Sequence, residues 1–210
     1  MSKMINGLFP GRLEPNATVA GCINIYENVW PEPHKTIKAA EEQCSNPDSG
    51  AFWTNAETIG LGVFQNARTN KVLGITHLAE VSQNPILKNI HNQFYALILA
   101  GVAPYTEKFN ILEGIWHEPY GLLRYRGGEE YKAHYDSTTS MGRIISVIVY
   151  LNDDYEGGEL EFPNFGIKIK PQAGMMVVFP SNFAYAHIAH PVTSGTKYAL
   201  VTWLQDRPPA

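Results

Sequence analysis

The spacing of hydrophobic and polar positions changes near residue 118 and divides the chain into two parts of different texture. Before that point, two stretches carry apolar residues at steps of three and four. After it, short apolar runs alternate with turn-forming residues. The first pattern favours helices and the second favours strands. We therefore predict a helical and mixed part over about residues 1–117 and a strand-rich core over about residues 118–205.

Two helices are predicted in the first part. Pro33 precedes a weakly amphipathic stretch at 34–43, and proline suits the first turn of a helix because its missing N–H would have no partner there. Asn84 opens a stronger helix, since asparagine is a good N-cap. Gly101 and Pro104 are expected to end it. The helix has one apolar face, which we expect to pack against a sheet. This face consists of Ile86, Leu87, Ile90, Phe94, Leu97 and Ile98.

The second part predicts seven short strands separated by turns rich in glycine, asparagine and aspartate. Short strands at regular spacing are typical of an antiparallel sandwich or barrel such as a jelly roll. We therefore expect a mostly β fold flanked by N-terminal helices, forming a single domain over residues 1–210. The strands are expected at 121–126, 144–151, 159–162, 166–170, 175–179, 187–190 and 198–204.

Composition narrows the choice of partners and compartment. The net charge is −4 and the lysines and arginines are scattered, which disfavours nucleic acid because a phosphate backbone demands a basic stripe. Residues 1–10 lack the apolar run of a signal peptide, and no stretch approaches the ~20 apolar residues of a membrane span. We expect a cytoplasmic protein without a membrane partner, in which Cys22 and Cys44 are free thiols rather than a disulfide.

His134 and Asp136 are candidate ligands of a metal ion. In an extended chain, residues two apart face the same side, so both can reach one ion. Two histidines and one carboxylate on one face of an ion leave the other positions open, as in non-haem iron(II) oxygenases. His187 and His190 are both candidates for the second histidine, and on a strand only one of them can face the ion. A structural His–Asp hydrogen bond near a turn is the alternative.

Three motifs, taken together, resemble the prolyl 4-hydroxylase branch of the 2-oxoglutarate and iron(II)-dependent oxygenases. They cover about residues 118–205. The resemblance implies a double-stranded β-helix core and Fe(II) held by His134, Asp136 and His187, with His190 as a bystander. The motifs are Tyr-x-x-Gly-x-x-Tyr-x-x-His-x-Asp at Tyr125–Asp136, Tyr150-Leu151-Asn152 followed by Gly157-Gly158-Glu159-Leu160, and His-x-x-x-Pro-Val-x-x-Gly-x-Lys at His187–Lys197.

The resemblance also implies the co-substrates, which are 2-oxoglutarate and O2, with ascorbate as an optional reductant and succinate and CO2 as products. Lys197 matches the family's basic residue for the distal carboxylate of 2-oxoglutarate, an anion that needs a cation when it is buried. A surface lysine is the alternative. Tyr125 and Tyr150 resemble tyrosines that bind or border the co-substrate, and core or rim tyrosines are the alternative.

Four residues, Glu118, Tyr131, Arg143 and Trp203, fall where the family places residues near a target proline, which implies a peptide or protein substrate that contains proline. Arg143 and Tyr150 are seven apart, so both line the site only if a bulge intervenes or Arg143 lies at the mouth of the strand. The alternatives are a solvated turn for Arg143 and core packing for Trp203.

Other functions stay open at this point. The substrate could be a free amino acid or another small metabolite, or the chain could be a cupin-like metal-binding module without turnover. Loops within residues 45–80, such as 66–70, could form a lid over a peptide.

Overall fold

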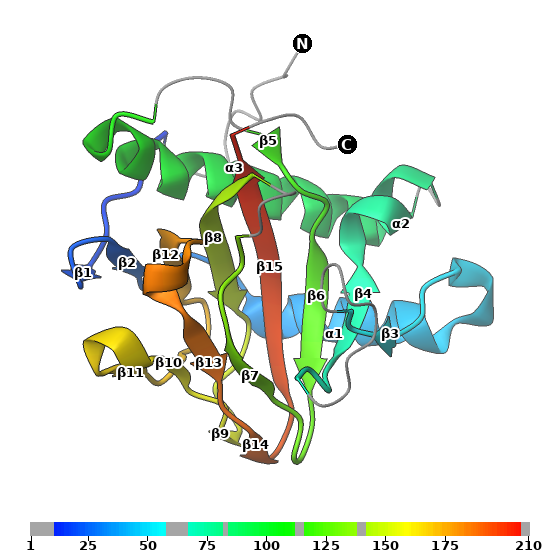
Figure 1. Cartoon of the computed structure of the whole chain (residues 1–210). Helices are drawn as coiled ribbons and strands as arrows, with labels where there is room; N and C mark the ends of the chain where they lie inside the picture. Colours follow the sequence, from blue (N-terminus) through cyan, green and yellow to red (C-terminus); the bar gives the residue numbers. More distant parts are fainter. Residues whose placement is uncertain (1–10, 58–66, 82–83, 112–115, 138–141, 207–210) are drawn as a thin grey trace.

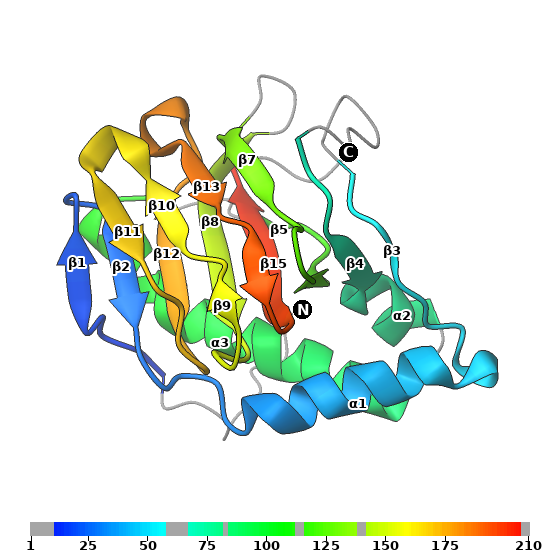
Figure 2. The ribbon, with the colours of Figure 1, turned by 90° about the horizontal axis from the view of Figure 1, so that it is seen from below.

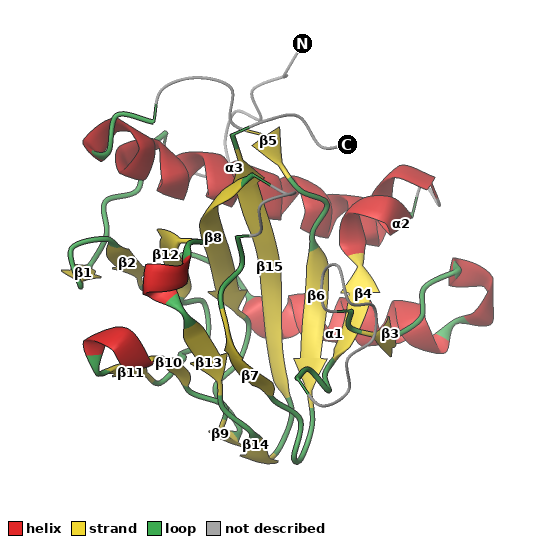
Figure 3. Cartoon of the chain, viewed as in Figure 1, coloured by secondary structure: helices red, strands yellow, loops and turns green. Residues whose placement is uncertain are grey.

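The structure, a computed structural model, describes residues 11–57, 67–81, 84–111, 116–137 and 142–206. Within them, helices cover one face of a large antiparallel sheet, and a smaller sheet lies against its other face (Figure 1 and Figure 2). Figure 3 shows the α-helices behind the large sheet and short helical turns beside the small sheet. The predicted mostly β, jelly-roll-like fold with N-terminal helices is confirmed.

The large sheet joins strands from both parts of the chain. The strands that precede residue 118 were not predicted, because they have only two to four residues each. Runs this short do not show a recognisable alternation of apolar and polar residues. These strands extend the sheet beyond the predicted core at both edges. The order is β1 (Ala17–Val19), β2 (Ile23–Tyr26), β12 (Met176–Pro180), β8 (Arg143–Tyr150), β15 (Lys197–Gln205), β6 (Gly121–Tyr125), β4 (Lys71–Gly74) and β3 (Thr54–Asn55), with β5 (Trp116–His117) paired to β15.

The small sheet carries the histidines. Its register places His187 directly opposite His134 across two antiparallel strands. Residues 53 positions apart in the sequence therefore become neighbours. The order is β11 (Ile167–Ile169), β10 (Leu160–Phe162), β13 (His187–Ala189) and β7 (Tyr131–His134); β14 (Val192–Ser194) pairs with β9 (Glu156–Gly157), and 3₁₀ turns occupy Pro47–Ser49, Pro163–Phe165 and Phe183–Tyr185.

Strand β15 shows how alternation divides the core. Tyr198 and Leu200 belong to the apolar cluster between the large sheet and the helices. Ala199 and Val201, of opposite parity, belong to clusters between the two sheets. Because successive side chains on a strand point to opposite faces, Lys197 shares the face of Ala199 and Val201. The sequence alternation thus directs a lysine into the interior of the jelly roll.

The helices are α1 (Pro33–Ser45), α2 (Ile75–Val81), which was not predicted, and α3 (Pro85–Lys108). The Asn84 side chain accepts hydrogen bonds from the N–H groups of Ile86 and Leu87 at 3.0 and 3.2 Å, which confirms its predicted capping role. Most of the predicted apolar stripe is buried, but Ile86 is exposed, because it lies in the first turn and points away from the sheet.

The prediction that α3 ends at Gly101 and Pro104 is wrong. Pro104 cannot donate to the carbonyl of Ala100, but the N–H of Leu13 donates to that carbonyl instead at 2.9 Å. Gly101 lies so close to Met176 that an added Cβ would clash with its terminal methyl group. The missing side chain therefore lets α3 approach the sheet, and tertiary contacts outweigh both helix-ending signals.

Cys22 and Cys44 are free. Burial raises the pKa of the Cys44 thiol to about 11, so it stays protonated at neutral pH and is a poor nucleophile.

Within the described ranges, the structure has no helix with the length and apolar character that crossing a bilayer requires.

Two glycines with left-handed backbones allow a matched stability test. Gly157 has φ 74°, and an added Cβ would clash with the carbonyl oxygen of Pro191, whereas Gly128 has φ 82° with nothing within 4 Å. Gly128→Ala is expected to lose about 1–2 kcal/mol of unfolding free energy for the left-handed conformation. Gly157→Ala is expected to lose about 1–3 kcal/mol more, because backbone must move. Urea unfolding measures both, and equal losses would contradict the predicted clash.

Candidate metal centre

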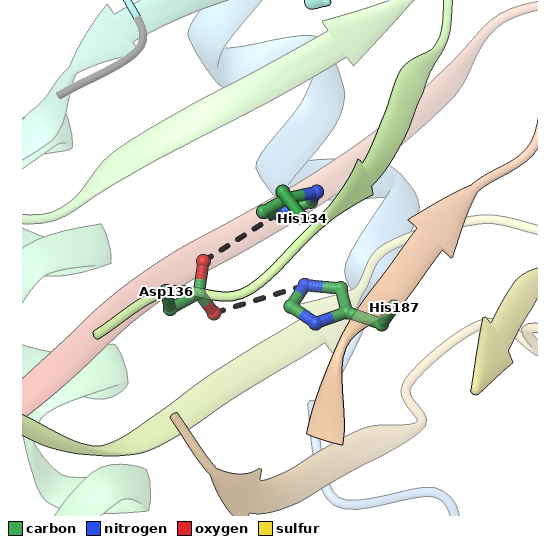
Figure 4. A group of neighbouring side chains, drawn as sticks. All are labelled: His134, Asp136 and His187. Carbon is green, nitrogen blue, oxygen red and sulfur yellow. Dashed lines mark ion pairs between the residues drawn. The ribbon is translucent and has the colours of Figure 1, made fainter. Parts of the chain in front are cut away.

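Three ligand-type side chains meet between the two sheets. His134 ends β7, Asp136 lies in the bend that follows, and His187 begins β13 (Figure 4). Their donor atoms all lie within 4.8 Å of one another. His134 Nε2 is 3.5 Å from Asp136 Oδ1, and His187 Nε2 is 3.7 Å from Asp136 Oδ2. Ligand atoms bonded at ~2.1 Å to one ion, at right angles, lie about 3 Å apart, so this donor set fits a single metal ion.

Backbone carbonyls set the tautomer of both histidines. His134 Nδ1 lies 2.8 Å from the carbonyl oxygen of Lys132, and His187 Nδ1 lies 3.2 Å from that of Tyr185. A carbonyl oxygen can only accept, so each Nδ1 carries the hydrogen. Each Nε2 then has a free lone pair that faces Asp136, the arrangement that metal-binding imidazoles need.

The charge states at neutral pH also suit a metal. Burial lowers the pKa of His187 to about 4, with His134 adding to this and Asp136 opposing it, so the imidazole is neutral. Burial alone would raise the pKa of Asp136, but His187, His134 and the Ser146 hydroxyl outweigh it and hold the pKa below its usual range. The centre therefore offers a neutral imidazole at His187 and a carboxylate anion at Asp136.

A stack of flat groups holds the His134 ring in place. The rings of Tyr131 and His134 are 3.4 Å apart between centroids and inclined by only 14°. On the other side, the Arg68 guanidinium carbon lies 4.7 Å from the centroid of the Tyr131 ring. Arg68 forms an isolated β-bridge with Tyr131, and the N–H of Lys132 donates to the carbonyl of Ala67. Tyr131 thus contacts a candidate ligand directly.

The sequence suggested that loops within residues 45–80, such as 66–70, could form a lid over a peptide. Part of this segment pairs with β7. Residues 67–70 lie against β7, and residues 58–66 lie outside the described part of the chain. Arg68 itself carried no signal in the sequence. Its place beside Tyr131 depends on pairing between segments that are more than sixty residues apart.

A narrow cavity of about 40 Å³ joins the metal centre to Lys197 and is lined by both, together with Tyr125 and Tyr150. Lys197 is 2% exposed, and its Nζ donates to the carbonyl of Gly158 at 2.6 Å. Among the described residues, no carboxylate lies within 4 Å of this Nζ. Burial lowers the pKa of Lys197 to about 7, with the charge of Glu159 opposing the shift. The surface-lysine alternative is therefore excluded.

Tyr125 and Tyr150 flank this lysine. Lys197 Nζ lies 5.2 Å from the centroid of each ring. Burial raises the pKa of Tyr125 to about 12 and also raises the pKa of Tyr150. Both phenols are therefore neutral hydrogen-bonding groups at physiological pH.

A second, wider cavity of about 240 Å³ adjoins the first and shares Arg68, Leu123, Val201 and Trp203 with it. Arg143 lines this cavity and is buried, so the solvated-turn alternative is wrong. The register of β8 and β15 shifts at Leu204 and Gln205, which supplies the irregularity needed for Arg143 and Tyr150 to serve one site.

Glu118 lies behind Arg143. It accepts from Arg143 Nε at 2.5 Å and also contacts Nη2. The Arg143 guanidinium carbon lies 3.7 Å from the centroid of the Trp203 ring. Glu118 is absent from the described lining of both cavities. It therefore orients Arg143, which in turn stacks on Trp203.

His190 takes no part in the metal cluster. Its Nε2 lies 2.5 Å from a carboxylate oxygen of Glu161, on the other side of β13 from His187.

Ser146 was not identified from the sequence, although its hydroxyl lies 2.6 Å from Asp136 Oδ2. A signal was present, because Ser146 is a polar residue in an apolar strand and shares the parity of Tyr150.

Residues 120–205 match the sequence profile of the 2OG-Fe(II) oxygenase superfamily. Over those residues, the chain resembles this superfamily. They include the three clustered side chains of the metal centre and also Lys197, Tyr125 and Tyr150. The superfamily implies Fe(II) and 2-oxoglutarate, and the donor set and the buried lysine of the chain fit both.

The chain is 34% identical to "Probable prolyl 4-hydroxylase 9" of Arabidopsis thaliana, over 43% of this chain and 41% of that protein. It is 39% identical to a PKHD-type hydroxylase of Shewanella sp. (strain ANA-3), over 40% of this chain and 41% of that protein. The chain thus spans about two fifths of the length of each of these relatives.

A structure from Trichoplax adhaerens has a similar fold. It is a prolyl hydroxylase in complex with a hypoxia inducible factor oxygen degradation domain peptide fragment. The TM-score is 0.71 with 21% sequence identity, and the match covers 89% of this chain and 84% of that chain. The likeness in fold therefore extends well beyond residues 120–205.

Proposed function

We propose that the chain is a 2-oxoglutarate- and Fe(II)-dependent dioxygenase that hydroxylates a prolyl residue in a peptide or protein and releases succinate and CO2. The observation that carries the proposal is the buried Lys197, which shares one narrow cavity with His134, Asp136 and His187. A buried cation without a nearby carboxylate is costly, and an acidic ligand relieves that cost. A dicarboxylate with one end at the metal and the other at Lys197 meets both requirements.

The residues of the chain bind and orient. His134 and His187 would hold the metal through Nε2 and Asp136 through its carboxylate, and Lys197 would hold the distal carboxylate of 2-oxoglutarate. When bound, Fe(II), 2-oxoglutarate and O2 together supply the oxidising power for C–H hydroxylation. None of these side chains has to donate or accept a proton in the reaction.

The walls of the cavity exclude water. Ile148, Leu160, Ala199 and Val201 line the space between the metal centre and the lysine. Apolar walls lower the local dielectric, which strengthens the attraction between Lys197 and a carboxylate. They also shield the reacting centre from solvent.

The adjoining cavity supports a peptide as the prime substrate. It shares lining residues with the metal cavity and carries hydrogen-bond donors. The indole Nε1 of Trp203 is buried and lacks a partner in the described part of the chain. Arg68 uses Nε for Asn70 and Nη1 for the carbonyl of Glu57, which leaves Nη2. Donors of this kind match peptide carbonyl oxygens, and the indole face of Trp203 suits a prolyl ring. The Arabidopsis thaliana relative, named a probable prolyl 4-hydroxylase, supports the same substrate class.

Incubation with Fe(II), 2-oxoglutarate, O2 and ascorbate tests the proposal. Proline-containing peptides are expected to stimulate succinate release and to gain one oxygen atom on proline, as read by tandem mass spectrometry. Matched peptides with alanine in place of proline serve as the control. Succinate release stimulated by free amino acids but by no peptide would contradict the peptide substrate. Absence of succinate with every substrate would contradict the dioxygenase activity itself.

A further inference from the structure

Two buried serines connect to the carboxylate of Asp136. Ser146 Oγ lies 2.6 Å from Asp136 Oδ2 and 2.8 Å from Ser181 Oγ. Ser146 is in the middle of β8, and Ser181 directly follows the neighbouring strand β12. Their exposed fractions are 0% and 1%, so bulk water does not reach either hydroxyl.

The chemistry of the groups sets the direction of these hydrogen bonds. Ionised Asp136 can only accept, so the hydroxyl of Ser146 donates to Oδ2. The oxygen of Ser146 is then available as an acceptor, and the hydroxyl of Ser181 donates to it. Hydrogen bonds to a charged acceptor are short and strong, and bonds in a chain polarise one another. The result is a directed relay from Ser181 through Ser146 to Asp136.

Ser181 also holds the backbone beside the carboxylate. Its carbonyl accepts from the N–H of Asp136 at 3.1 Å and from the N–H of Ser137 at 2.8 Å. Its own N–H donates to the carbonyl of Ile144 on β8 at 3.0 Å. One residue therefore fixes the bend that carries Asp136, both through the main chain and, by way of Ser146, through the side chain.

The two oxygens of Asp136 consequently differ in their surroundings. Oδ1 faces His134 Nε2 at 3.5 Å and Oδ2 faces His187 Nε2 at 3.7 Å, but Oδ2 also accepts the hydroxyl hydrogen of Ser146. The hydrogen bond uses one lone pair of Oδ2 and draws electron density from this oxygen, so Oδ1 is the stronger metal ligand of the two. One-oxygen binding occupies one coordination position instead of two, which keeps positions open for co-substrates.

We propose that the Ser181–Ser146 relay is a positioning device that makes Asp136 bind the metal through one oxygen and raises the metal affinity of the site. The proposal rests on the proposed function, since it assumes a metal at His134, Asp136 and His187. The serines themselves touch neither substrate nor metal. Their effect passes through Asp136, as for other outer-shell partners of metal ligands.

Metal affinity without turnover is the direct test. Mn²⁺ titration of the purified chain is expected to give a dissociation constant about 10–100-fold higher for Ser146→Ala than for the unmodified protein. Ser181→Ala is expected to weaken binding less, because Ser146 can still donate. Thr36→Val is the matched control: it removes a buried hydroxyl that accepts from Trp30 Nε1, and we expect unchanged Mn²⁺ affinity.

The electronic absorption spectrum of the Co²⁺-loaded protein separates positioning from general loss of stability. Ser146→Ala is expected to change the Co²⁺ bands, because the carboxylate becomes free to bind through both oxygens, whereas Thr36→Val leaves them unchanged. If Ser146→Ala does not fold, Ser181→Ala carries the same test. Unchanged Mn²⁺ affinity and Co²⁺ spectra in the folded serine variants would overturn the relay. Failure of the unmodified chain to bind Mn²⁺ would overturn the proposed metal centre, and the relay with it.

Discussion

His187→Ala is expected to abolish both Mn²⁺ binding and succinate formation. His187 Nε2 is one of three donor atoms gathered within 4.8 Å, and its tautomer is set by the carbonyl of Tyr185. Loss of an outer-shell partner alone weakens metal binding by about 10–100-fold, so loss of a ligand should exceed about 100-fold. Isothermal titration with Mn²⁺ and a succinate assay measure the two effects.

His190→Ala is the matched control for this variant. It also removes an imidazole beside β13, but this imidazole contacts Glu161 on the outer side of the small sheet. We expect metal affinity and turnover close to those of the unmodified protein. Circular dichroism establishes that both variants are folded. If His190→Ala lost the metal while His187→Ala kept it, the assignment of the third ligand would be wrong.

Lys197→Met is expected to raise the dissociation constant for 2-oxoglutarate by more than about 100-fold while Mn²⁺ affinity stays unchanged. Removing one partner of a buried ion pair costs about 3–5 kcal/mol, and each 1.4 kcal/mol is about tenfold in affinity. Methionine replaces most of the buried stem of the lysine and removes only its charge. Titration of 2-oxoglutarate into the Mn²⁺-loaded protein avoids turnover. Unchanged affinity would remove Lys197 from the co-substrate site.

The pH dependence of this binding provides a second measurement on the same residue. Burial lowers the pKa of Lys197 to about 7 in the free protein, so the lysine is largely charged below pH 7 and neutral above it. Affinity for 2-oxoglutarate is therefore expected to be highest below about pH 7 and to fall by about tenfold per pH unit above it, because binding must take up a proton.

Lys197→Arg is the control for the pH effect. A guanidinium stays charged throughout this range, so this variant is expected to bind 2-oxoglutarate with little dependence on pH between 7 and 9. A pH profile in the unmodified protein as flat as in Lys197→Arg would contradict a neutral lysine above pH 7.

Local signals in the sequence were sufficient for several features. The two-residue spacing of His134 and Asp136 placed both side chains toward one point, and Asn84 marked the start of α3. The alternation in β15 placed Lys197 and Trp203 on one face, and both line the same cavity. Each of these features depends on residues within a few positions of one another. Backbone geometry alone relates such residues in space.

Contacts between distant segments decided the rest. The choice of His187 over His190, which the residue spacing left open and the family resemblance suggested, follows in space from the register that pairs His187 with His134. Helix α3 continues past Pro104 because Leu13, far away in the sequence, donates to the carbonyl that proline leaves unpaired. The serine relay behind Asp136 joins two strands and a bend. These contacts depend on how strands and helices pack, and that packing minimises the free energy of the whole chain rather than of any one segment.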